Sequence, residues 1–509
     1  MNIGQTIKEV TSMAIAEKVY DFKVEKVKSQ VMTAFKKRKN ESTISDLVTA
    51  TGLPKYQVEQ TTKLVCDEYC GHMKVTESGE ILYYFPSGMK SRYRGAGIAF
   101  KRFFKSFFSV MGKILTVLFK IWIMLMLVVY FLVFLAIIVL AIAAAIAASA
   151  SSKSRSRRGG AGGMMFLVLR LLQLFLRIFF WVQLTKDSRE KPKGRAFYKS
   201  VFGYVFGDED PNKEFNTDEK IQILSFIRSN KGVITTEELM ALTGHNYSAS
   251  QALMNTFLVE FEGEPMVTDD GTLFFFFPEL LRTSKKEMLL QEVSSISESK
   301  QKKLIPFSGN KGKSNGIITF FNGFNLLFGL YFTVFSLIGI RDAVEIGFGQ
   351  LYVFVYQGLF QELLEVLAPH TIIFIGLGVV PLVFSTLMFL VPIIRNIVRI
   401  RKNEKIKQEN LSKKLYTSIY YNPVAFLPAS VRPGSKDDSP KNADQFVIKA
   451  TDRFAGDKHA EIEVTGDNKT VYNFEELHRE IKDIAGYRQT VNTAKYEVGE
   501  TVFDSNADA

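Results

Sequence analysis

An uninterrupted apolar stretch at residues 121–148 constrains this chain more than any other feature. It reads IWIMLMLVVYFLVFLAIIVLAIAAAIAA, with no charged residue, no proline and no glycine. As a helix it would be about 42 Å long, which exceeds the ~30 Å hydrocarbon core of a bilayer. A helix satisfies its backbone N–H and C=O groups internally, so lipid accepts one that is apolar on all sides. The sequence therefore predicts an integral membrane protein with a span over 121–148.

Two later apolar runs, 316–340 and 371–394, predict a transmembrane hairpin within residues 314–400, with a bend near Pro381. Basic residues flank this hairpin on both sides: Lys300, Lys302, Lys303, Lys311 and Lys313 before it, and Arg395, Arg399, Arg401, Lys402, Lys405 and Lys407 after it. Positive flanks mark the cytoplasmic side, where they also attract anionic lipid. The acidic loop 341–370 is therefore expected on the outside.

The membrane region 99–190 contains a second apolar segment, 164–184, that carries polar residues. Arg170, Gln173 and Arg177 follow helical spacing and share one face. This helix either crosses the bilayer with that face turned into protein or lies flat at the headgroups. We favour two crossings, 121–148 and 164–184, although the basic loop between them would then lie outside. The alternative is a re-entrant first run followed by a flat helix.

Two segments outside the membrane share one pattern. Residues 1–98 predict an N-terminal helix, a short helix capped at Ser45–Asp46, a glycine turn, a second helix and a hairpin, which is the layout of a winged helix-turn-helix domain. A shift of 192 residues aligns 47–86 with 239–278 without a gap and superposes the turn glycines. A weaker echo of the hairpin alone lies at 464–474. The fold class predicted is an α-helical polytopic membrane protein with two duplicated small α+β winged-helix domains, the second within 191–300, followed by a cytoplasmic basic helix and polar tail over 401–509.

Charge argues against DNA as the ligand of these domains. Residues 41–86 hold three lysines against seven acidic residues, and residues 233–278 hold seven acidic residues and no Lys or Arg. DNA affinity comes mainly from basic side chains that neutralise phosphates. On the second helix of the first domain, the candidate interaction residues are Lys55, Gln57, Gln60 and Lys63. We therefore expect the domains to bind protein partners or each other.

Catalytic and metal-binding motifs are weak in this sequence. Cys66, Cys70 and His72 form a C-x3-C-x-H cluster, but the repeat sets Leu258 opposite Cys66, which indicates a small core residue rather than a zinc ligand. There is no P-loop, GxSxG, HExxH or dinucleotide motif. We expect no enzyme activity, no cofactor and no metal. Within the later hairpin, Asn322 and Asn325 share a face with Gly329, which favours helix packing over a substrate path.

From about Phe202 onward the chain resembles an uncharacterised membrane-protein family of cyanobacteria and chloroplast envelopes. The residues that carry the resemblance are FGDEDPN at 206–212, FEGEPMVTDDGTLFFFFPEL at 261–280 and RNIVRIRKNEKIKQEN at 395–410. It covers roughly 200 residues and implies an architecture, not an activity. Plant members have been labelled iron–sulfur assembly proteins, but two cysteines on one short helix do not make a cluster site.

Three functional hypotheses follow. The leading one is a non-enzymatic scaffold or adaptor in the cytoplasmic membrane of a bacterium, multi-pass, with both winged-helix domains on the cytosolic side. The second is a membrane-tethered regulator whose first winged helix contacts DNA. The third is a small transporter or channel built from the later hairpin and the Arg-bearing helix.

Overall fold

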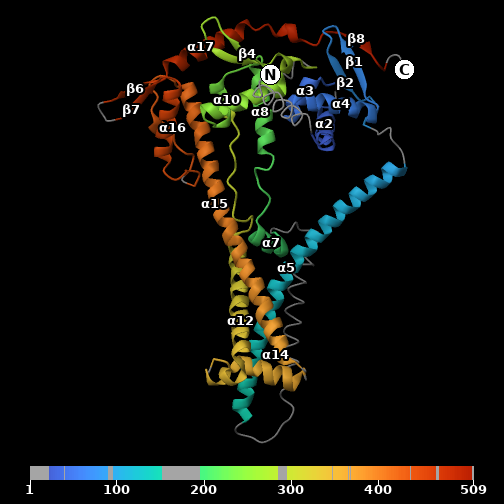
Figure 1. The fold of residues 1–509 in the computed structure, drawn as a ribbon, viewed down its shortest axis with the longest axis vertical. Coiled ribbons are helices and arrows are strands. Elements are labelled where there is room, and N and C mark those ends of the chain that lie inside the picture. Colours follow the sequence, from blue (N-terminus) through green and yellow to red (C-terminus); the bar gives the residue numbers. More distant parts are fainter. Residues whose placement is uncertain are drawn as a thin grey trace, which may run out of the picture. The chain divides into compact units, whose positions relative to one another are not determined.

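The computed structural model describes residues 22–38, 41–86, 88–89, 96–151, 195–284, 295–346, 348–364, 366, 368–435, 437–465 and 469–506. The chain divides into two compact units. Unit 1 contains residues 1–100, 210–304 and 402–509, and unit 2 contains residues 101–209 and 305–401. The fold is mostly helical, with three small sheets (Figure 1).

Unit 2 is helical and holds the apolar runs. Its elements are α5 (Ala96–Ser151), α7 (Phe197–Phe206), α12 (Gly312–Glu345), α13 (Gln350–Val353), η3 (Phe354–Leu363), α14 (Pro369–Ile372), η4 (Ile373–Val379) and the first half of α15 (Val380–Tyr421). Three stretches of the described residues are long and apolar enough to cross a membrane, namely Val110–Ala147, Gly312–Glu345 and Pro369–Tyr421. They overlap the expected spans 121–148, 316–340 and 371–394, so the sequence correctly indicated possible membrane helices there. The other favoured crossing, 164–184, lies outside the described residues.

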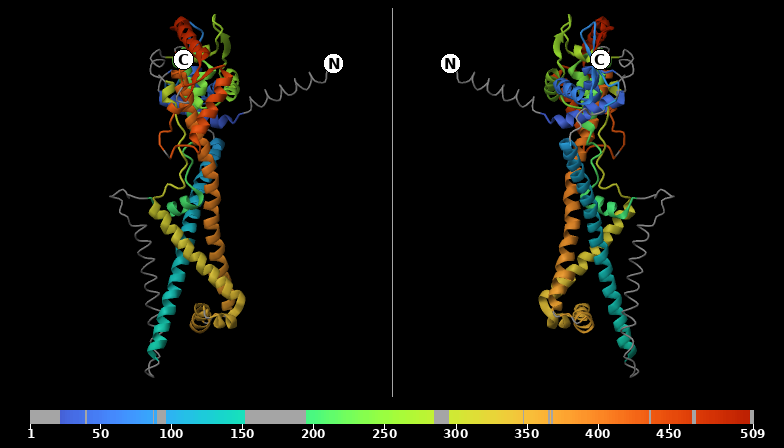
Figure 2. Two further views of the ribbon diagram at one scale, coloured as in Figure 1. Left: turned by 90° about the vertical axis from the view of Figure 1, so that its left-hand side faces the viewer. Right: turned by 90° about the vertical axis from the view of Figure 1, so that its right-hand side faces the viewer.

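Long helices of unit 2 pack along one another (Figure 2). One apolar cluster joins Leu127 of α5, Ile318 of α12 and Met388 of α15. The expected bend near Pro381 takes the form of the π-helix η4, which ends at Val379. Pro381 has no N–H to donate to the carbonyl four residues earlier, so regular α-helical bonding cannot run through this point. Helix α12 is itself kinked at Gly339, where φ is 86°.

Unit 1 contains two segments with a similar order of elements, and the second has an additional two-residue strand. The first comprises α2 (Val24–Arg38), α3 (Ile44–Thr51), α4 (Lys55–Tyr69), β1 (His72–Thr76) and β2 (Ile81–Tyr84). The second comprises α8 (Phe215–Ser229), β3 (Val233–Ile234), α9 (Thr236–Thr243), α10 (Tyr247–Phe261), β4 (Glu264–Val267) and β5 (Leu273–Phe276). Each short helix, α3 and α9, ends at a glycine with positive φ, Gly52 and Gly244.

A capping box starts each short helix. The Thr43 hydroxyl accepts a hydrogen bond from Asp46 N, and the Asp46 carboxylate accepts one from Thr43 N. Thr235 and Glu238 make the same reciprocal pair at α9. The expected cap at Ser45–Asp46 was therefore wrong by two residues, because Thr43 has the extended backbone that an N-cap requires and Ser45 lies inside the helix.

The C-terminal part of the chain completes unit 1. It contributes the second half of α15, then η5 (Pro428–Ser430), α16 (Ala443–Asp457), β6 (Glu461–Val464), β7 (Thr470–Asn473), α17 (Glu475–Thr490), η6 (Thr493–Tyr496) and β8 (Thr501–Asp504). Strands β6 and β7 form a hairpin at the site of the weak echo. Strand β8 pairs with β1, which gives the sheet order β2-β1-β8. A single apolar cluster includes Leu47, Phe257, Leu415 and Phe474, so all three parts of the chain share one core.

Candidate interaction site

The four candidate interaction residues of α4 have different surroundings. Lys55 Nζ lies 2.6 Å from Glu262 Oε2 and 2.9 Å from Glu279 Oε2. Burial would lower the pKa of Lys55, but the hydrogen bonds and charges of the two glutamates outweigh it and raise that pKa. Gln57 donates to the Tyr56 hydroxyl, and Gln60 is exposed. The fourth, Lys63, is exposed and pairs with Glu59 one turn away. Lys55 is thus bound to the second segment.

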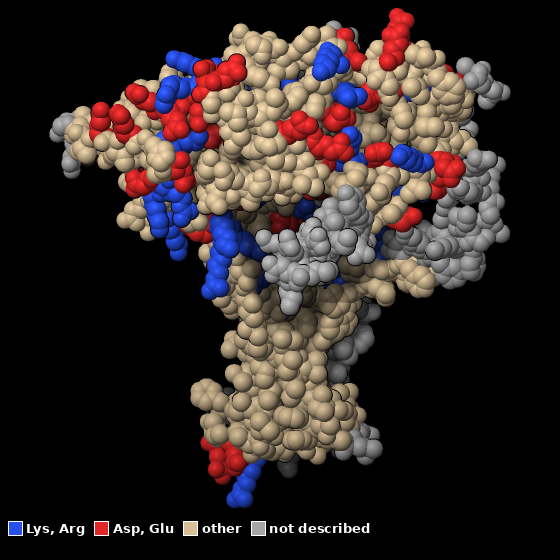
Figure 3. Space-filling model, turned by 45° about the horizontal axis from the view of Figure 1, so that its top comes forward, with Lys and Arg blue, Asp and Glu red and all other residues tan. Residues whose placement is uncertain are grey.

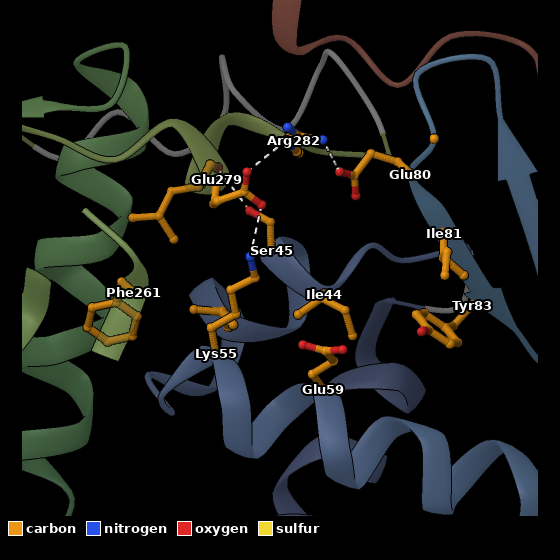
Figure 4. A pocket seen from close by; sticks show the side chains of 13 residues that line it. Ile44, Ser45, Lys55, Glu59, Glu80, Ile81, Tyr83, Phe261, Glu279 and Arg282 are labelled. Atoms are coloured by element: carbon orange, nitrogen blue, oxygen red, sulfur yellow. Dashed lines mark hydrogen bonds and ion pairs between the residues drawn. The ribbon is translucent and has the colours of Figure 1, made fainter. Parts of the chain in front are cut away.

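Lys55 borders a cavity of about 210 Å³ between the two segments of unit 1. Figure 4 shows Lys55 and Glu59 rising from α4, with Arg282 and Glu279 on the opposite wall. Arg282 pairs with Glu80 of the first hairpin turn and with Glu279. The basic groups of this cavity are therefore held by carboxylates of both segments, in an arrangement that clamps the segments together.

A buried ion pair lies beneath this cavity. Arg228 of α8 and Asp46 of α3 are both 0% exposed, and Arg228 Nη2 lies 3.2 Å from Asp46 Oδ1. Arg228 also donates to Ser45 Oγ at 2.9 Å and to the Leu280 carbonyl at 2.8 Å. A buried charge is tolerated only when it is paired and hydrogen-bonded, and these contacts meet that requirement.

The ionised state of Asp46 is stabilised by its neighbours. Burial alone would raise the pKa of Asp46, but the charges of Arg228 and Arg38 and hydrogen bonds from Ser284 N and Thr283 Oγ1 outweigh it. The pKa therefore lies below its usual value of 3.8. Asp46 therefore completes the capping box of α3 and also binds the second segment.

Glu238, the capping-box acid of the second segment, is anchored in a similar way by C-terminal elements. Its Oε2 lies 2.7 Å from Arg488 Nη2 of α17, and its Oε1 accepts from the Tyr420 hydroxyl of α15 at 2.8 Å. The preceding residue, Glu237, pairs with Lys458 at 2.7 Å. Burial and the charge of Glu238 raise the pKa of Tyr420, which keeps the phenol protonated as a donor.

The sequence did not reveal the basic partners in these contacts. Arg228, Lys413 and Arg488 lie 182, 194 and 250 residues along the chain from the acids they meet. Lys413 is 1% exposed and lies 2.7 Å from Glu219. The sequence does indicate that Asp46 and Glu238 help to cap helices, because TISD at 43–46 and TTEE at 235–238 both match the capping-box pattern.

Within the C-x3-C-x-H cluster, Cys66 is a buried core residue. Burial raises the pKa of the Cys66 thiol to about 12, so it is protonated at neutral pH. Metal ligands are thiolates. Cys70 is exposed, and His72 Nδ1 lies 3.5 Å from Ser505 Oγ. Among the described residues no group of three His, Cys, Asp or Glu side chains could hold a metal ion.

Two polar residues of α12, Asn322 and Asn325, make interhelical hydrogen bonds. Asn322 Nδ2 donates to the Ser385 carbonyl of α15 at 2.9 Å, and Asn325 Nδ2 donates to the Leu127 carbonyl of α5 at 2.8 Å. Both side chains are 0% exposed. Gly329, one turn further along α12, faces the Leu382 backbone. Arg170, Gln173 and Arg177 lie outside the described residues.

Charged side chains of both signs are interspersed over the surface of unit 1 (Figure 3). No broad field of basic residues dominates the face of unit 1 drawn there, although the chain has a formal net charge of +12. DNA-binding surfaces concentrate Lys and Arg on one face. This face has the mixed charge typical of a solvated or protein-binding surface.

Comparison with known proteins gives one partial similarity. A stretch of 105 residues is 31% identical to an uncharacterised chloroplastic protein of Arabidopsis thaliana. The match covers 19% of this chain and 20% of that protein, so only a fifth of the relative's length is represented. No family model and no solved structure matches the chain. The similarity agrees with the resemblance to a chloroplast-associated family and carries no activity with it.

Proposed function

We propose that this protein is a multi-pass membrane scaffold or adaptor without catalytic activity, whose two winged-helix segments bind a protein partner or a second copy of the chain. The segments lie on the cytosolic side of a bacterial cytoplasmic membrane in this proposal. The basic flanks of the later hairpin support that side, because Arg395, Arg399 and Arg401 follow an apolar stretch that can span.

Matching backbone contacts support the winged-helix assignment. In the first segment Ser42 bridges Tyr83, and in the second Ile234 pairs with Phe275. Both residues of the second pair lie 192 positions after those of the first. The capping boxes and the αL residues Cys70 and Glu262 obey the same offset. A third strand closing a helix–helix–hairpin unit is the winged-helix arrangement.

The observation that carries the proposal is that Lys55 forms ion pairs with carboxylates of the second segment. The best candidate for a phosphate contact on α4 is held by Glu262 and Glu279. A DNA phosphate would have to displace two carboxylates, which leaves Lys63, exposed and paired with Glu59 one turn away, as the more accessible basic group among the four candidates. The pairing favours a protein-binding module over the alternative of a membrane-tethered DNA-binding regulator.

Exposed apolar side chains on the second hairpin supply a surface for such a partner. Val267 and Leu273 are directly opposite each other and are 62% and 45% exposed. Met266 beside them is 36% exposed. Contiguous exposed apolar residues are typical of interaction sites. The interhelical bonds of Asn322 and Asn325 weigh against the other alternative, a transporter or channel, because they are those of packed helices.

Site-specific crosslinking tests this proposal. A photoreactive residue at position 267 of the full chain, illuminated in native membranes, should give one discrete protein adduct whose mass distinguishes a second copy from another protein. Leu273→Glu should abolish the adduct by placing a charge in the contact. The matched control Ile462→Glu, on the exposed β6 strand, should retain it.

Two experimental outcomes would contradict the adaptor proposal. An illuminated sample with no protein adduct at 267 would remove the support for an adaptor. Salt-dependent retention of duplex DNA by the full chain in nanodiscs, lost in Lys63→Gln, would replace it with the DNA-binding alternative.

A further inference from the structure

A second cavity in unit 1, distinct from the one beside Lys55, has a different electrostatic character. Its volume is about 430 Å³, and it lies where the start of α2, the α3–α4 turn and the start of α8 meet. Three lysines line it together with neutral amide and hydroxyl groups: Lys23, Lys26, Lys220, Gln57, Asn216 and Thr217. No Asp or Glu is among the described residues that line it.

Helical spacing brings these groups onto common faces. Lys23 directly precedes α2 and lies three residues before Lys26, and Gln30 follows one turn after Lys26 on α2. Across the cavity, Thr217 and Lys220 are three residues apart on α8. The walls are therefore built from regular helices, which hold donors at defined positions.

The α3–α4 turn closes tightly on α8 because its central residue is Gly52. This residue has φ of 66°, and a β-carbon there would lie 3.3 Å from Lys220 Cβ and 3.4 Å from the Thr217 carbonyl oxygen. Glycine thus allows the close approach that brings Gln57 of α4 to the same cavity as Lys220.

The lysines differ in how their charges are balanced. Lys220 Nζ lies 2.7 Å from Glu260 Oε2. Lys23 and Lys26 are exposed, and within the described part of the chain neither has an ion-pair partner, whereas Lys28 on the next face of α2 pairs with Glu68. Lys23 and Lys26 therefore carry positive charge that no described carboxylate balances, and they lie beside neutral hydrogen-bond donors.

We propose that this cavity binds a small soluble anion of the phosphate class, the phosphate or diphosphate group of a metabolite. Lysine ammonium groups make charge-assisted hydrogen bonds to phosphate oxygens, and amide and hydroxyl donors complete such a shell. The volume matches sites for small ligands. Phe22, Leu53 and Pro54 add apolar wall for an organic part. The inference is independent of the proposed adaptor function, because it concerns a different face of unit 1.

Calorimetric titration with inorganic pyrophosphate tests the proposal on the full chain in nanodiscs of zwitterionic lipid. Saturable binding is expected, and it should weaken as salt rises because ion contacts are screened. The double variant Lys23→Gln with Lys26→Gln should weaken binding at least tenfold. Both side chains are exposed, so its unfolding temperature should match that of the wild type. Lys63→Gln, an exposed lysine on α4 away from this cavity, should bind as the wild type does.

Three results would overturn the proposal. The first is no saturable binding of pyrophosphate. The second is equal binding by the double variant. The third is binding of the chain to vesicles rich in phosphatidylglycerol, or to duplex DNA, that requires Lys23 and Lys26 and that pyrophosphate does not inhibit. This result would assign the two lysines to a macromolecular surface.

Discussion

Arg228 is the single side chain on which the joining of the two segments most depends. It is fully buried, and it contacts Asp46 and Ser45 of the first segment and the Leu280 carbonyl after the second. A buried charge whose partner is removed costs far more than an exposed pair. Removing one partner of the buried pair Arg228–Asp46 should therefore cost much stability, whereas removing one partner of the exposed pair Lys63–Glu59 should cost little.

Replacing Arg228 with Met should destabilise unit 1 by about 3–5 kcal/mol, because Asp46 then remains buried with only Arg38 as a charged neighbour. Chemical denaturation of the full chain in detergent measures the loss. The control Lys63→Met removes a pair that is 62% and 42% exposed and should cost under about 0.5 kcal/mol. In the Asp46→Asn background the Arg228 substitution should cost much less. Equal costs in both backgrounds would contradict a coupling between the two residues.

Acid should weaken unit 1 through Asp46. The folded-state pKa of Asp46 lies below its usual value of 3.8, so its contribution to stability is complete above that value and is lost as the pH falls through the folded-state pKa. The unfolding midpoint of the wild type should therefore fall with pH below about 3.8. Asp46→Asn should lower stability at neutral pH and flatten this dependence. A parallel pH profile for the two proteins would show that other carboxylates control acid unfolding.

A local sequence pattern marks the acids of these pairs but not their partners, although only Asp46 was expected at a helix start. Asp46 and Glu238 stand three residues after a threonine, and that spacing is a property of a helix start. Arg228 lies 182 residues from Asp46, and its position in the last turn of α8 reads as an exposed charge that complements the helix dipole. Only the tertiary fold shows that it points inward.

At the scale of elements, a close helix contact in unit 2 can be tested with two glycines of α12. A β-carbon at Gly329 would lie 2.7 Å from the Leu382 nitrogen and 3.0 Å from its Cα, whereas one at Gly323 would meet nothing within 4 Å. Backbone atoms cannot rotate away as a side chain can.

Gly329→Ala should therefore destabilise unit 2 by about 1–3 kcal/mol, because α12 and α15 must separate. Gly323→Ala should leave stability unchanged or slightly raised, since alanine favours helix. Thermal unfolding of both variants in detergent provides the comparison. Similar midpoints would mean that α12 does not approach Leu382 this closely.

Element boundaries outside the membrane followed the sequence closely. The second helix predicted for the first segment runs from Lys55 to Tyr69, because Pro54 and the turn at Cys70–Gly71 limit it. Strand β8 was not predicted. Its four residues carry no strong apolar alternation, and it exists because β1 offers an open edge.

The first hairpin accepts β8 through a donor that the second hairpin lacks. Met73 N donates to Ser505 Oγ at 2.9 Å, and Ser505 N donates back to the Met73 carbonyl. The matching position in β4 is Pro265, which has no N–H. The difference explains why the C-terminal strand pairs with β1 rather than β4.

At the scale of the whole molecule, the proposed topology makes a labelling prediction. Single cysteines at Gln350 and Asp270, in a Cys66→Ala, Cys70→Ser background, should differ in intact cells. An impermeant maleimide should label Gln350→Cys without opening the cells and Asp270→Cys only after opening, because the loop is expected outside and the second segment inside. Labelling of Asp270→Cys in intact cells would overturn both the adaptor and the regulator hypotheses.

Composition and apolar run length predicted the candidate spans, because length and hydropathy decide them locally. They did not predict that residues 402–509 share a core with residues 22–89. That association depends on Leu415, Phe474 and their neighbours, which pack against apolar residues hundreds of positions away in the sequence. The periodicity of a helix predicts which of its faces is apolar, but it does not predict which other element packs against that face.

The discontinuity of unit 1 has a consequence for biosynthesis. A ribosome that has finished residue 100 must still add about 300 residues before the third part of the unit emerges, which takes about 15–60 s at ordinary elongation rates. During that interval Glu238 has no Arg488 and the first hairpin has no β8. A nascent chain in this state exposes apolar residues that the third part of the unit later covers, which favours aggregation. Any product that terminates before residue 402 should be cleared by quality-control proteases instead of accumulating as a shortened protein.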